Sequence, residues 1–75
     1  MEKEEEKFIK NFGDKVKKLR IEKKLSQEML ANDANIPINQ IGRIERSEIA
    51  TSLGTIFKIA TALNIKVKEL FDFDQ

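Results

Sequence analysis

The apolar residues of this chain recur at steps of three and four, and that spacing limits what the chain can fold into. Such steps place side chains along one face of an α-helix, whereas a half-buried strand needs strict alternation. One stripe occupies positions 8, 9, 12, 16 and 19, and a later one occupies positions 53, 56, 57, 60 and 63. No stretch alternates convincingly, so we predict an all-α fold of one domain, which is what 75 residues allow.

Capping residues divide the first half of the chain into separate helices. The first helix is expected from about residue 6 to Lys23, with a shorter helix capped by Asn11 as the alternative. Ser26 suits the N-cap of a second helix that ends near Ala34. Asn35 tolerates the left-handed conformation in which many helices end, so we expect a sharp turn there.

A third and a fourth helix are expected after this turn. Pro37 fits the first turn of a helix over roughly residues 37–46, because its missing N–H is not needed there. Residues 47–52 form a loop in this interpretation. Thr51 or Ser52 then caps the fourth helix, whose apolar positions make up the second stripe.

The last third of the chain completes the expected architecture. Asn64 resembles another helix-ending residue, and a short fifth helix is expected over about residues 67–73. The prediction is therefore a compact five-helix bundle. It comprises a flexible N-terminal segment at residues 1–7, a single domain at residues 8–73 and a C-terminal tail at residues 74–75.

The composition excludes several kinds of chemistry. The chain has no Cys and no His, which rules out disulfides, thiol chemistry, thiolate or imidazole metal sites and His-based acid–base catalysis. Asp72 and Asp74 are interpreted as solvated charges near the C-terminus. We therefore expect no enzyme, no catalytic or metal site and no cofactor.

Hydropathy and charge indicate a binding module. No apolar run approaches the roughly 20 residues needed to cross a bilayer, and no secretory signal follows Met1, so we expect a cytoplasmic protein without a membrane partner. Fourteen basic residues face thirteen acidic ones, a net charge of +1, unlike a non-specific nucleic-acid coat. The basic cluster within residues 11–25 is best interpreted as a solvated helix face. DNA binding, if present, would depend on the placement of few contacts.

The second and third helices fit the physical requirements of a helix-turn-helix. Two short helices joined by a tight turn need a small residue where they cross, and Ala31 is available. They need a residue tolerant of positive φ at the turn, and Asn35 is available. They also need apolar anchors at consistent spacing, which are Leu30, Ala34, Ile36, Ile41 and Ile44.

The third helix also presents an outer face suited to DNA. With Ile41 and Ile44 buried, the opposite side carries Asn39, Gly42, Arg43 and Arg46, flanked by Ile38 and Gln40. Asn can pair with both major-groove atoms of adenine, and Arg with both acceptors of guanine. Ordinary surface polarity and packing are sufficient explanations for Gln40 and Gly42 alone. Asn39 and Arg43, one turn apart in this motif, favour DNA.

These residues resemble a known family. The stretch from Phe12 to Phe71 is similar to the Cro and phage-repressor type (XRE family) helix-turn-helix domain, a lambda-repressor-like fold. The matching pieces are LR at 19–20, LSQ at 25–27, LA at 30–31, IGRIE at 41–45 and KIATALNI at 58–65. Each piece is weak, but their order and spacing together are specific.

The resemblance implies a third helix that enters the major groove, and dimers that bind two-fold symmetric operators. It implies base contacts by Ile38, Asn39, Gln40 and Arg43. It implies phosphate contacts by Ser26, Gln27, Arg46 and Thr51, with Gln27 also bracing the base-reading residues. Arg20 and Glu45 resemble the internal ion pair of the family; two unrelated surface charges are the alternative.

The chain departs from the family pattern at several positions. Met29 stands where many relatives have Glu, so the usual capping box is incomplete. Asn35 and Ser47 stand where Gly is common, and Ala50 and Thr51 replace a loop that contains Pro. Glu48, together with the absence of basic residues nearby, is expected to weaken the hold on phosphate.

The leading hypothesis is a sequence-specific transcriptional regulator that binds double-stranded DNA as a homodimer and has no small-molecule effector domain. Phe71, Phe73 and Ile49 are the apolar candidates for a dimer interface, although Phe71 fits the core better. The alternative is a protein-interaction module that kept the fold and lost DNA, which the near-neutral net charge favours. A salt titration separates these hypotheses, because DNA affinity falls with salt as phosphates are neutralised.

Overall fold

The computed structural model describes residues 2–73, which form four α-helices and a short 3-10 helix. The elements are α1 (Lys3–Glu22), α2 (Gln27–Ala34), α3 (Ile38–Glu45), α4 (Leu53–Ala62) and η1 (Val67–Phe71). The described residues contain no strand, which confirms the all-α prediction. The expected tail at residues 74–75 lies outside the described part.

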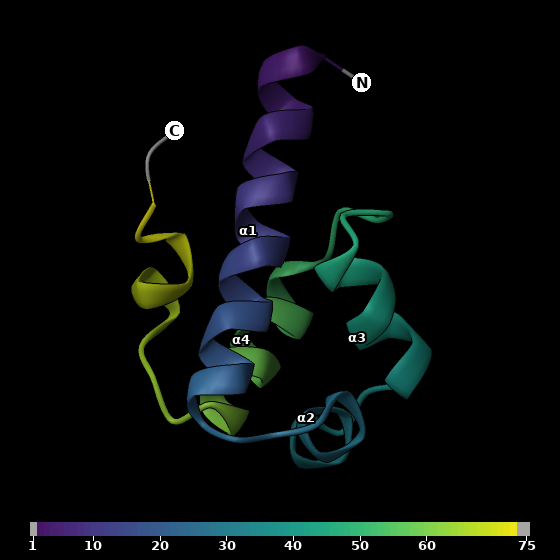
Figure 1. Cartoon of the computed structure of the whole chain (residues 1–75), viewed down its shortest axis with the longest axis vertical. Coiled ribbons are helices and arrows are strands. Elements are labelled where there is room, and N and C mark those ends of the chain that lie inside the picture. The colour runs from purple at the N-terminus through teal and green to yellow at the C-terminus, as the bar shows by residue number, and fades with distance from the viewer. Residues whose placement is uncertain (1, 74–75) are drawn as a thin grey trace.

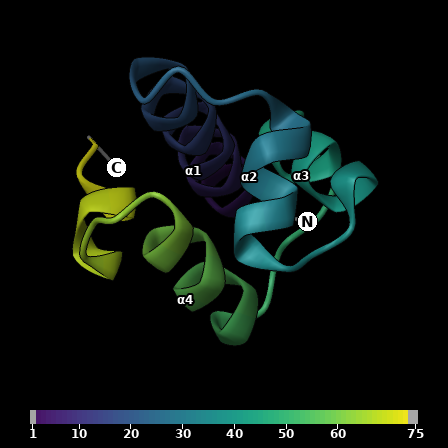
Figure 2. The same ribbon diagram turned by 90° about the horizontal axis from the view of Figure 1, so that it is seen from below.

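The helix α1 runs along the longest dimension of the molecule, which measures 32 × 22 × 20 Å (Figure 1). It packs on α3 and on η1, while α4 packs on α2 and η1, and α2 packs directly on α3. Seen from below, η1 lies beside α1 and α4, on the side away from α3 (Figure 2). The helix-turn-helix formed by α2 and α3 is therefore supported by two other helices and leaves one side of α3 uncovered.

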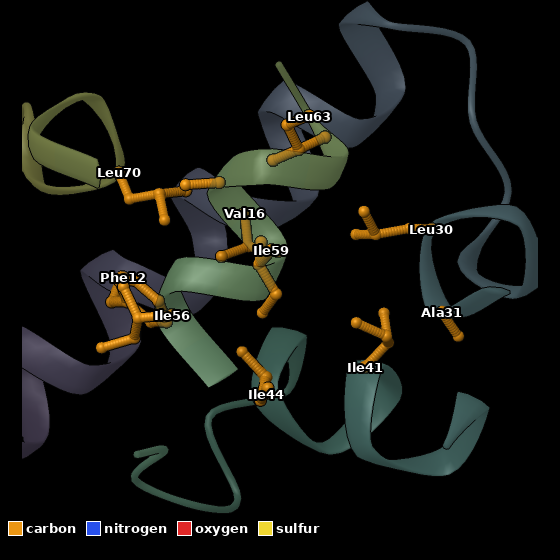
Figure 3. Close-up of a cluster of buried hydrophobic side chains, with 11 residues drawn as sticks. Phe12, Val16, Leu30, Ala31, Ile41, Ile44, Ile56, Ile59, Leu63 and Leu70 are labelled. Carbon is orange, nitrogen blue, oxygen red and sulfur yellow. The ribbon is translucent and has the colours of Figure 1, made fainter. Parts of the chain in front are cut away.

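The core lies where the four α-helices and η1 converge (Figure 3). The fully buried large side chains are Val16, Leu30, Ile41, Ile44, Ile59, Leu63 and Leu70. Ala31 is 1% exposed, as expected for a small residue at the crossing of α2 and α3. Each fully buried aliphatic side chain contributes about 1.5–3 kcal/mol relative to an exposed one. Burial of this set therefore fixes how α3 sits on the bundle.

The start of α1 differs from the prediction. The helix begins at Lys3 rather than near residue 6, and it runs through Asn11, so the shorter alternative is wrong. Three glutamates in its first turn, Glu4, Glu5 and Glu6, favour this early start because negative charge stabilises the N-terminal end of a helix dipole.

The next three helices begin with different N-cap residues. Ser26 Oγ accepts a hydrogen bond of 3.0 Å from the backbone N–H of Met29 at the start of α2, as predicted for an N-cap. Pro37 precedes α3 as its N-cap residue instead of occupying the first turn. In α4, Ser52 rather than Thr51 is the cap, and its Oγ accepts from Thr55 N–H at 3.1 Å.

All four α-helices end in the same backbone motif. The residue with positive φ donates its N–H to the carbonyl three residues earlier, and the next residue donates to the carbonyl five residues earlier. The residues with positive φ are Lys24, Asn35, Ser47 and Asn64, at 60°, 58°, 62° and 58°. The expected turns at Asn35 and Asn64 are thus confirmed. None of the four positions is glycine, so each turn carries some backbone strain.

The last element corrects the five-helix prediction. Residues 67–71 form a 3-10 helix, so the described chain has four α-helices and one 3-10 helix. Such tighter geometry suits very short segments, and this one buries Leu70 completely. Lys66 offers no side-chain oxygen as a cap, and the carboxylate of Glu69 accepts the backbone N–H of Lys66 at 2.8 Å.

An aromatic cluster joins the C-terminal segment to α1. The ring of Phe71 stacks on Phe12 and Phe8, with centroids 5.2 and 5.8 Å apart. Phe73 lies 5.6 Å from Phe8 and 6.4 Å from Phe71 between centroids. Phe71 and Phe73 are therefore used within the chain, as is Ile49, which packs partly buried against the core. The three apolar candidates for a dimer interface are thus partly covered within the chain itself.

The apolar stripe of α4 is also different from the prediction. Leu53 is 84% exposed and Phe57 is 64% exposed, although both belong to the apolar stripe that the sequence indicates. The buried residues are Ile56, Ile59, Ala60 and Leu63. A helical stripe centred on those residues leaves positions 53 and 57 at its edge, where they form an exposed apolar pair one turn apart.

A glycine in the middle of α1 lets that helix approach α3 closely. A Cβ atom added at Gly13 would collide with the backbone carbonyl oxygen of Ile44 and lie 3.0 Å from Ser47 Oγ. The prediction from sequence did not use Gly13. Its signal was available, because glycine inside a helix costs about 0.5–1 kcal/mol relative to alanine and often marks a close approach.

Candidate nucleic-acid interface

The uncovered side of α3 carries the expected base-reading residues. Asn39 and Arg43 are exposed, with 51% of the Arg43 side chain open to solvent. Ile38 is 49% exposed, and Gln40 is half-buried at the flank. The opposite side of the helix is fixed in the core by Ile41 and Ile44. The amide of Asn39 and the guanidinium of Arg43 thus stand on a rigid support, and both groups can form paired hydrogen bonds with base edges.

Gly42 is buried, although the helical wheel placed it on the outer side of this helix. The guanidinium of Arg46 lies over it and Gln27 lies beside it. A Cβ atom at Gly42 would lie 2.8 Å from Arg46 Nη1 and 3.6 Å from Gln27 Oε1. The absence of a side chain therefore makes room for Arg46 to fold back along its own helix.

Glu48 holds Arg46 in this folded position. Arg46 Nε donates to Glu48 Oε2 at 2.6 Å, and Arg46 Nη2 donates to Glu48 Oε1 at 3.4 Å. Arg43 Nε lies 3.9 Å from Glu48 Oε1, which is within ion-pair range but too long for a hydrogen bond. One carboxylate thus faces both guanidiniums of the candidate interface. We call this group, Arg43, Arg46 and Glu48, the exposed clasp.

The contacts within the exposed clasp shift the pKa of Glu48 and of Arg46. The hydrogen bond from Arg46 holds the pKa of the Glu48 carboxyl below its ordinary value, and the positive charges of Arg46 and Arg43 act in the same direction. The hydrogen bond to Glu48 and the negative charge of Glu48 raise the pKa of Arg46. Both groups are therefore charged at neutral pH.

The N-terminus of α2 offers a second, smaller set of polar groups. Ser26 is exposed, and its Oγ accepts the backbone N–H of Met29 as the N-cap of α2. Gln27 is half-buried, and its Nε2 donates to Glu45 Oε1 at 3.0 Å. The Gln27 side chain therefore joins α2 to α3, beside Gly42. The first N–H groups of a helix are free donors and can bind phosphate.

Arg20 and Glu45 form a bidentate ion pair between α1 and α3. Arg20 Nε lies 2.7 Å from Glu45 Oε2, and Arg20 Nη2 lies 3.0 Å from Glu45 Oε1. Arg20 Nη1 also donates to the carbonyl of Leu25 at 2.8 Å. Only 11% of the Arg20 side chain and 2% of the Glu45 side chain are exposed. Together with the bond from Gln27, the carboxylate of Glu45 ties α1, α2 and α3 at one point.

Thr51 lies apart from these groups in the structure. Its Oγ1 is buried, and within residues 2–73 this is a side-chain oxygen without a hydrogen-bond partner. In this position the hydroxyl is not open to a phosphate at the surface. The other expected phosphate-contacting residues lie on α2 or at the end of α3, in keeping with a single surface.

The pairing of Glu48 with Arg46 was not predicted from the sequence. The residues that follow the positive-φ positions are Leu25, Ile36, Glu48 and Ile65. The three aliphatic members of this set pack against the core, whereas Glu48 is exposed. The sequence signal was therefore the acidic residue Glu48 directly after a helix end. The other three helices of this chain have an aliphatic residue at that position.

Metal-ligating clusters and membrane-spanning helices are absent from residues 2–73. No group of three or more acidic side chains could hold a metal ion there, and none of the helices described is long and apolar enough to span a bilayer.

Comparisons with known proteins agree with this geometry. The chain is 41% identical over 63 residues to the control protein C.BamHI of Bacillus amyloliquefaciens, a match that covers 83% of this chain and 78% of that protein. It is 38% identical over 58 residues to the immunity repressor protein of Bacillus phage phi105, which covers 77% of this chain but 40% of the repressor.

A solved structure has the same fold. The crystal structure of the restriction-modification controller protein C.AhdI from Aeromonas hydrophila superposes with a TM-score of 0.83 at 41% sequence identity, covering 84% of this chain and 96% of that one. The family model described as Helix-turn-helix matches residues 16–70, which include α2, α3, α4 and most of the core. This chain therefore belongs to the helix-turn-helix family, of the Cro and phage-repressor type.

Proposed function

We propose that this protein is a sequence-specific DNA-binding regulator of transcription whose helix α3 enters the major groove. The observation that carries the proposal is the exposed face of α3, where Asn39 and Arg43 stand one turn apart on a helix fixed from behind. Membership of the family and the regulators among its relatives support it. Such a regulator acts on the chromosome, so a cytoplasmic location is part of the proposal.

The residues divide into two roles in this proposal. Ile38, Asn39, Gln40 and Arg43 meet base edges, with Ile38 suited to a thymine methyl group. Ser26, Gln27 and Arg46 meet phosphates, as Thr51 does after rotation of its side chain. The buried pair of Arg20 and Glu45 sets the angle of α3 and touches no DNA.

The named relatives favour one type of regulator. The controller from Aeromonas hydrophila and the Bacillus amyloliquefaciens control protein are each 41% identical to this chain, compared with 38% for the phage repressor. We therefore propose a controller of a restriction–modification system rather than a phage switch. In that case the DNA selected by the protein should occur upstream of restriction and modification genes in its own genome.

A second copy of this chain is the occupant we propose for the exposed apolar pair on α4. Leu53 and Phe57 expose apolar surface that the fold itself leaves uncovered. A two-fold axis beside α4 would pair these residues with their equivalents in the partner, since the interface of a symmetric dimer is self-complementary. A two-fold symmetric operator requires such an arrangement of two α3 helices.

The dimer is tested by sedimentation at micromolar concentration. Phe57→Lys should shift the wild-type dimer toward monomer, because a charge would be buried at the centre of the interface. Ile21→Lys is the matched control, since Ile21 is 55% exposed on α1. A dimer that withstands Phe57→Lys, or a wild-type monomer, would refute this interface.

DNA recognition is tested by selection from a pool of randomised duplexes at low salt. The wild type should enrich one sequence with two-fold symmetry. Arg43→Ala should cost about 1–3 kcal/mol and relax preference at one base position, while Arg46→Ala should weaken all sequences alike. Lys68→Ala is the control, because Lys68 is exposed on η1, which packs on α1 and α4. Failure to enrich any sequence would refute the proposed function and favour a protein-interaction module.

A further inference from the structure

Glu48 occupies an unusual place beside the proposed DNA-binding face. The left-handed turn at Ser47 brings the backbone N–H of Glu48 to within 2.8 Å of the carbonyl oxygen of Arg43. The chain is thereby folded back against the last turn of α3. This backbone geometry positions the Glu48 carboxylate next to both arginines of that turn, at the place where the other three helix ends carry aliphatic side chains.

Arg46 is held on two sides in the free protein. Its guanidinium lies over Gly42, where no side chain opposes it, and it donates twice to the Glu48 carboxylate. Arg43 is approached by the same carboxylate but makes no hydrogen bond with it. The two arginines are thus restrained to different degrees, because Arg46 is hydrogen-bonded to Glu48 whereas Arg43 is held more loosely.

We propose that Glu48 limits the affinity of this protein for DNA by competing with phosphate for Arg46. The inference rests on the proposed function and adds to it an internal competitor. A carboxylate and a phosphate oxygen are alternative acceptors for the same guanidinium. Arg46 must therefore leave Glu48, or share its donors, before it can neutralise a phosphate.

Two consequences distinguish this competition from a simple change of net charge. When Arg46 is paired with Glu48, its contact with a phosphate releases fewer counterions from the DNA. The affinity therefore falls less steeply with salt than it would if Arg43 and Arg46 were both free. Because Arg46 is assigned to phosphate, its release should strengthen binding to every sequence. The preference for one sequence, which depends on the loosely held Arg43, should stay nearly the same.

The test uses Glu48→Gln, which keeps the shape of the side chain and an acceptor oxygen but removes the charge. Dissociation constants are measured by fluorescence anisotropy over a series of salt concentrations, on the duplex selected by the wild type and on a scrambled duplex. Glu22→Gln is the matched control, because Glu22 is exposed at the C-terminal end of α1 and its replacement changes the net charge equally. Circular dichroism and sedimentation verify that all variants keep the fold and the oligomeric state.

Glu48→Gln should bind both duplexes about 10-fold more tightly, with a log–log salt slope steeper by about one. Glu22→Gln should change binding by less than about 2-fold, since the charge it removes is remote and screened. The ratio between the selected and scrambled duplexes should stay within about 3-fold of wild type.

A double-mutant cycle assigns the effect to Arg46. In the Arg46→Ala background, Glu48→Gln should improve binding by less than about 3-fold, because the competed guanidinium is gone. An equal gain in both backgrounds, or an equal gain from Glu22→Gln, would mean that only net charge matters and would overturn the inference. Unchanged or weaker binding by Glu48→Gln would also overturn it.

The outcome also separates this inference from the proposed function. If the wild type enriches a sequence and Glu48→Gln gains nothing, the competition is wrong and DNA recognition stands. If neither protein enriches any sequence at low salt, the proposed function is wrong and the inference falls with it.

Discussion

Two arginine–glutamate pairs involve the C-terminal end of α3, and they differ mainly in burial. Arg20 and Glu45 are 11% and 2% exposed in their side chains, whereas Arg46 and Glu48 are 58% and 48% exposed. Their shortest contacts are nearly equal, at 2.7 and 2.6 Å. Equal geometry therefore does not mean an equal role.

The difference follows from the cost of removing charge from water. A buried charge that loses its partner has no solvent to replace it, so the pair of Arg20 and Glu45 works as a fixed joint. An exposed charge exchanges partners cheaply, so the pair of Arg46 and Glu48 can open when a phosphate arrives. The buried pair of Arg20 and Glu45 (the inner pair) thus positions α3. The exposed pair of Arg46 and Glu48 (the outer pair) can exchange the carboxylate for a phosphate.

Breaking the inner pair should have the largest effect. Glu45→Gln leaves Arg20 without its counter-charge and weakens the bond from Gln27, so we expect a loss of about 3–5 kcal/mol in the free energy of unfolding. Urea denaturation followed by circular dichroism measures it, with Glu22→Gln as the exposed control. A loss below about 1 kcal/mol would contradict the fixed joint.

The close contact between α1 and α3 provides a second test of how firmly the bundle holds α3. Gly13→Ala places a methyl group against the Ile44 carbonyl, and we expect a net loss of about 1–3 kcal/mol despite the better helix propensity of alanine. Gly54→Ala is the matched control, because the nearest atom to its added Cβ is Ser52 Oγ at 3.9 Å. That variant should gain about 0.5–1 kcal/mol in thermal or urea unfolding. Equal effects of the two substitutions would argue against a tight helix contact.

The turn at Ser47 lies between Glu45 and Glu48, and a substitution there should change the free energy of unfolding by a smaller amount. Ser47 has a φ of 62°, which costs a non-glycine residue about 1–2 kcal/mol, so Ser47→Gly should raise the free energy of unfolding by about 1 kcal/mol. Ala50→Gly in the same loop lacks a positive φ to relieve and should not stabilise the fold. Denaturation midpoints of both variants decide the matter, and destabilisation by Ser47→Gly would show that the serine side chain is needed there.

The outer pair should be visible in a titration rather than in stability. We expect NMR titration of the Glu48 carboxyl to give a midpoint below the ordinary value of 4.5, because Arg46 stabilises the ionised form. A lowered folded-state pKa means that the pair stabilises the fold above the unfolded-state value and loses this contribution as pH falls through the folded-state value. In Arg46→Ala the midpoint should rise, and an unchanged midpoint would show that the pair does not form in solution.

Much of the fold could be predicted from residue type and spacing. Ser26, Asn35 and Asn64 marked helix boundaries because capping and left-handed geometry depend on local chemistry. The prediction that Leu53 and Phe57 belong to the apolar stripe of α4 was wrong. Both residues lie at the edge of that stripe, and only tertiary packing shows where its centre is. The same holds for the last element, whose 3-10 geometry depends on docking Leu70 and Phe71 against α1 and α4.

The candidate site was predictable to a lesser degree. Asn39 and Arg43 followed from the helical wheel, because Ile41 and Ile44 fix which side is buried. The contact of Glu48 with Arg46 depends on the path of the loop after Ser47, and that path is set by one positive φ. Burial of Gly42 beneath Arg46 depends on the same contact, so the wheel alone misplaced it.

The most direct test of the central claim is to map the surface that meets DNA. Amide chemical shifts of the isotope-labelled protein are recorded during titration with the duplex it selects and with a scrambled duplex. If α3 reads the DNA, the largest changes specific to the selected duplex occur in residues 38–46 and at the N-terminus of α2. Changes confined to α4 around Leu53 and Phe57, with α3 unaffected, would contradict this claim.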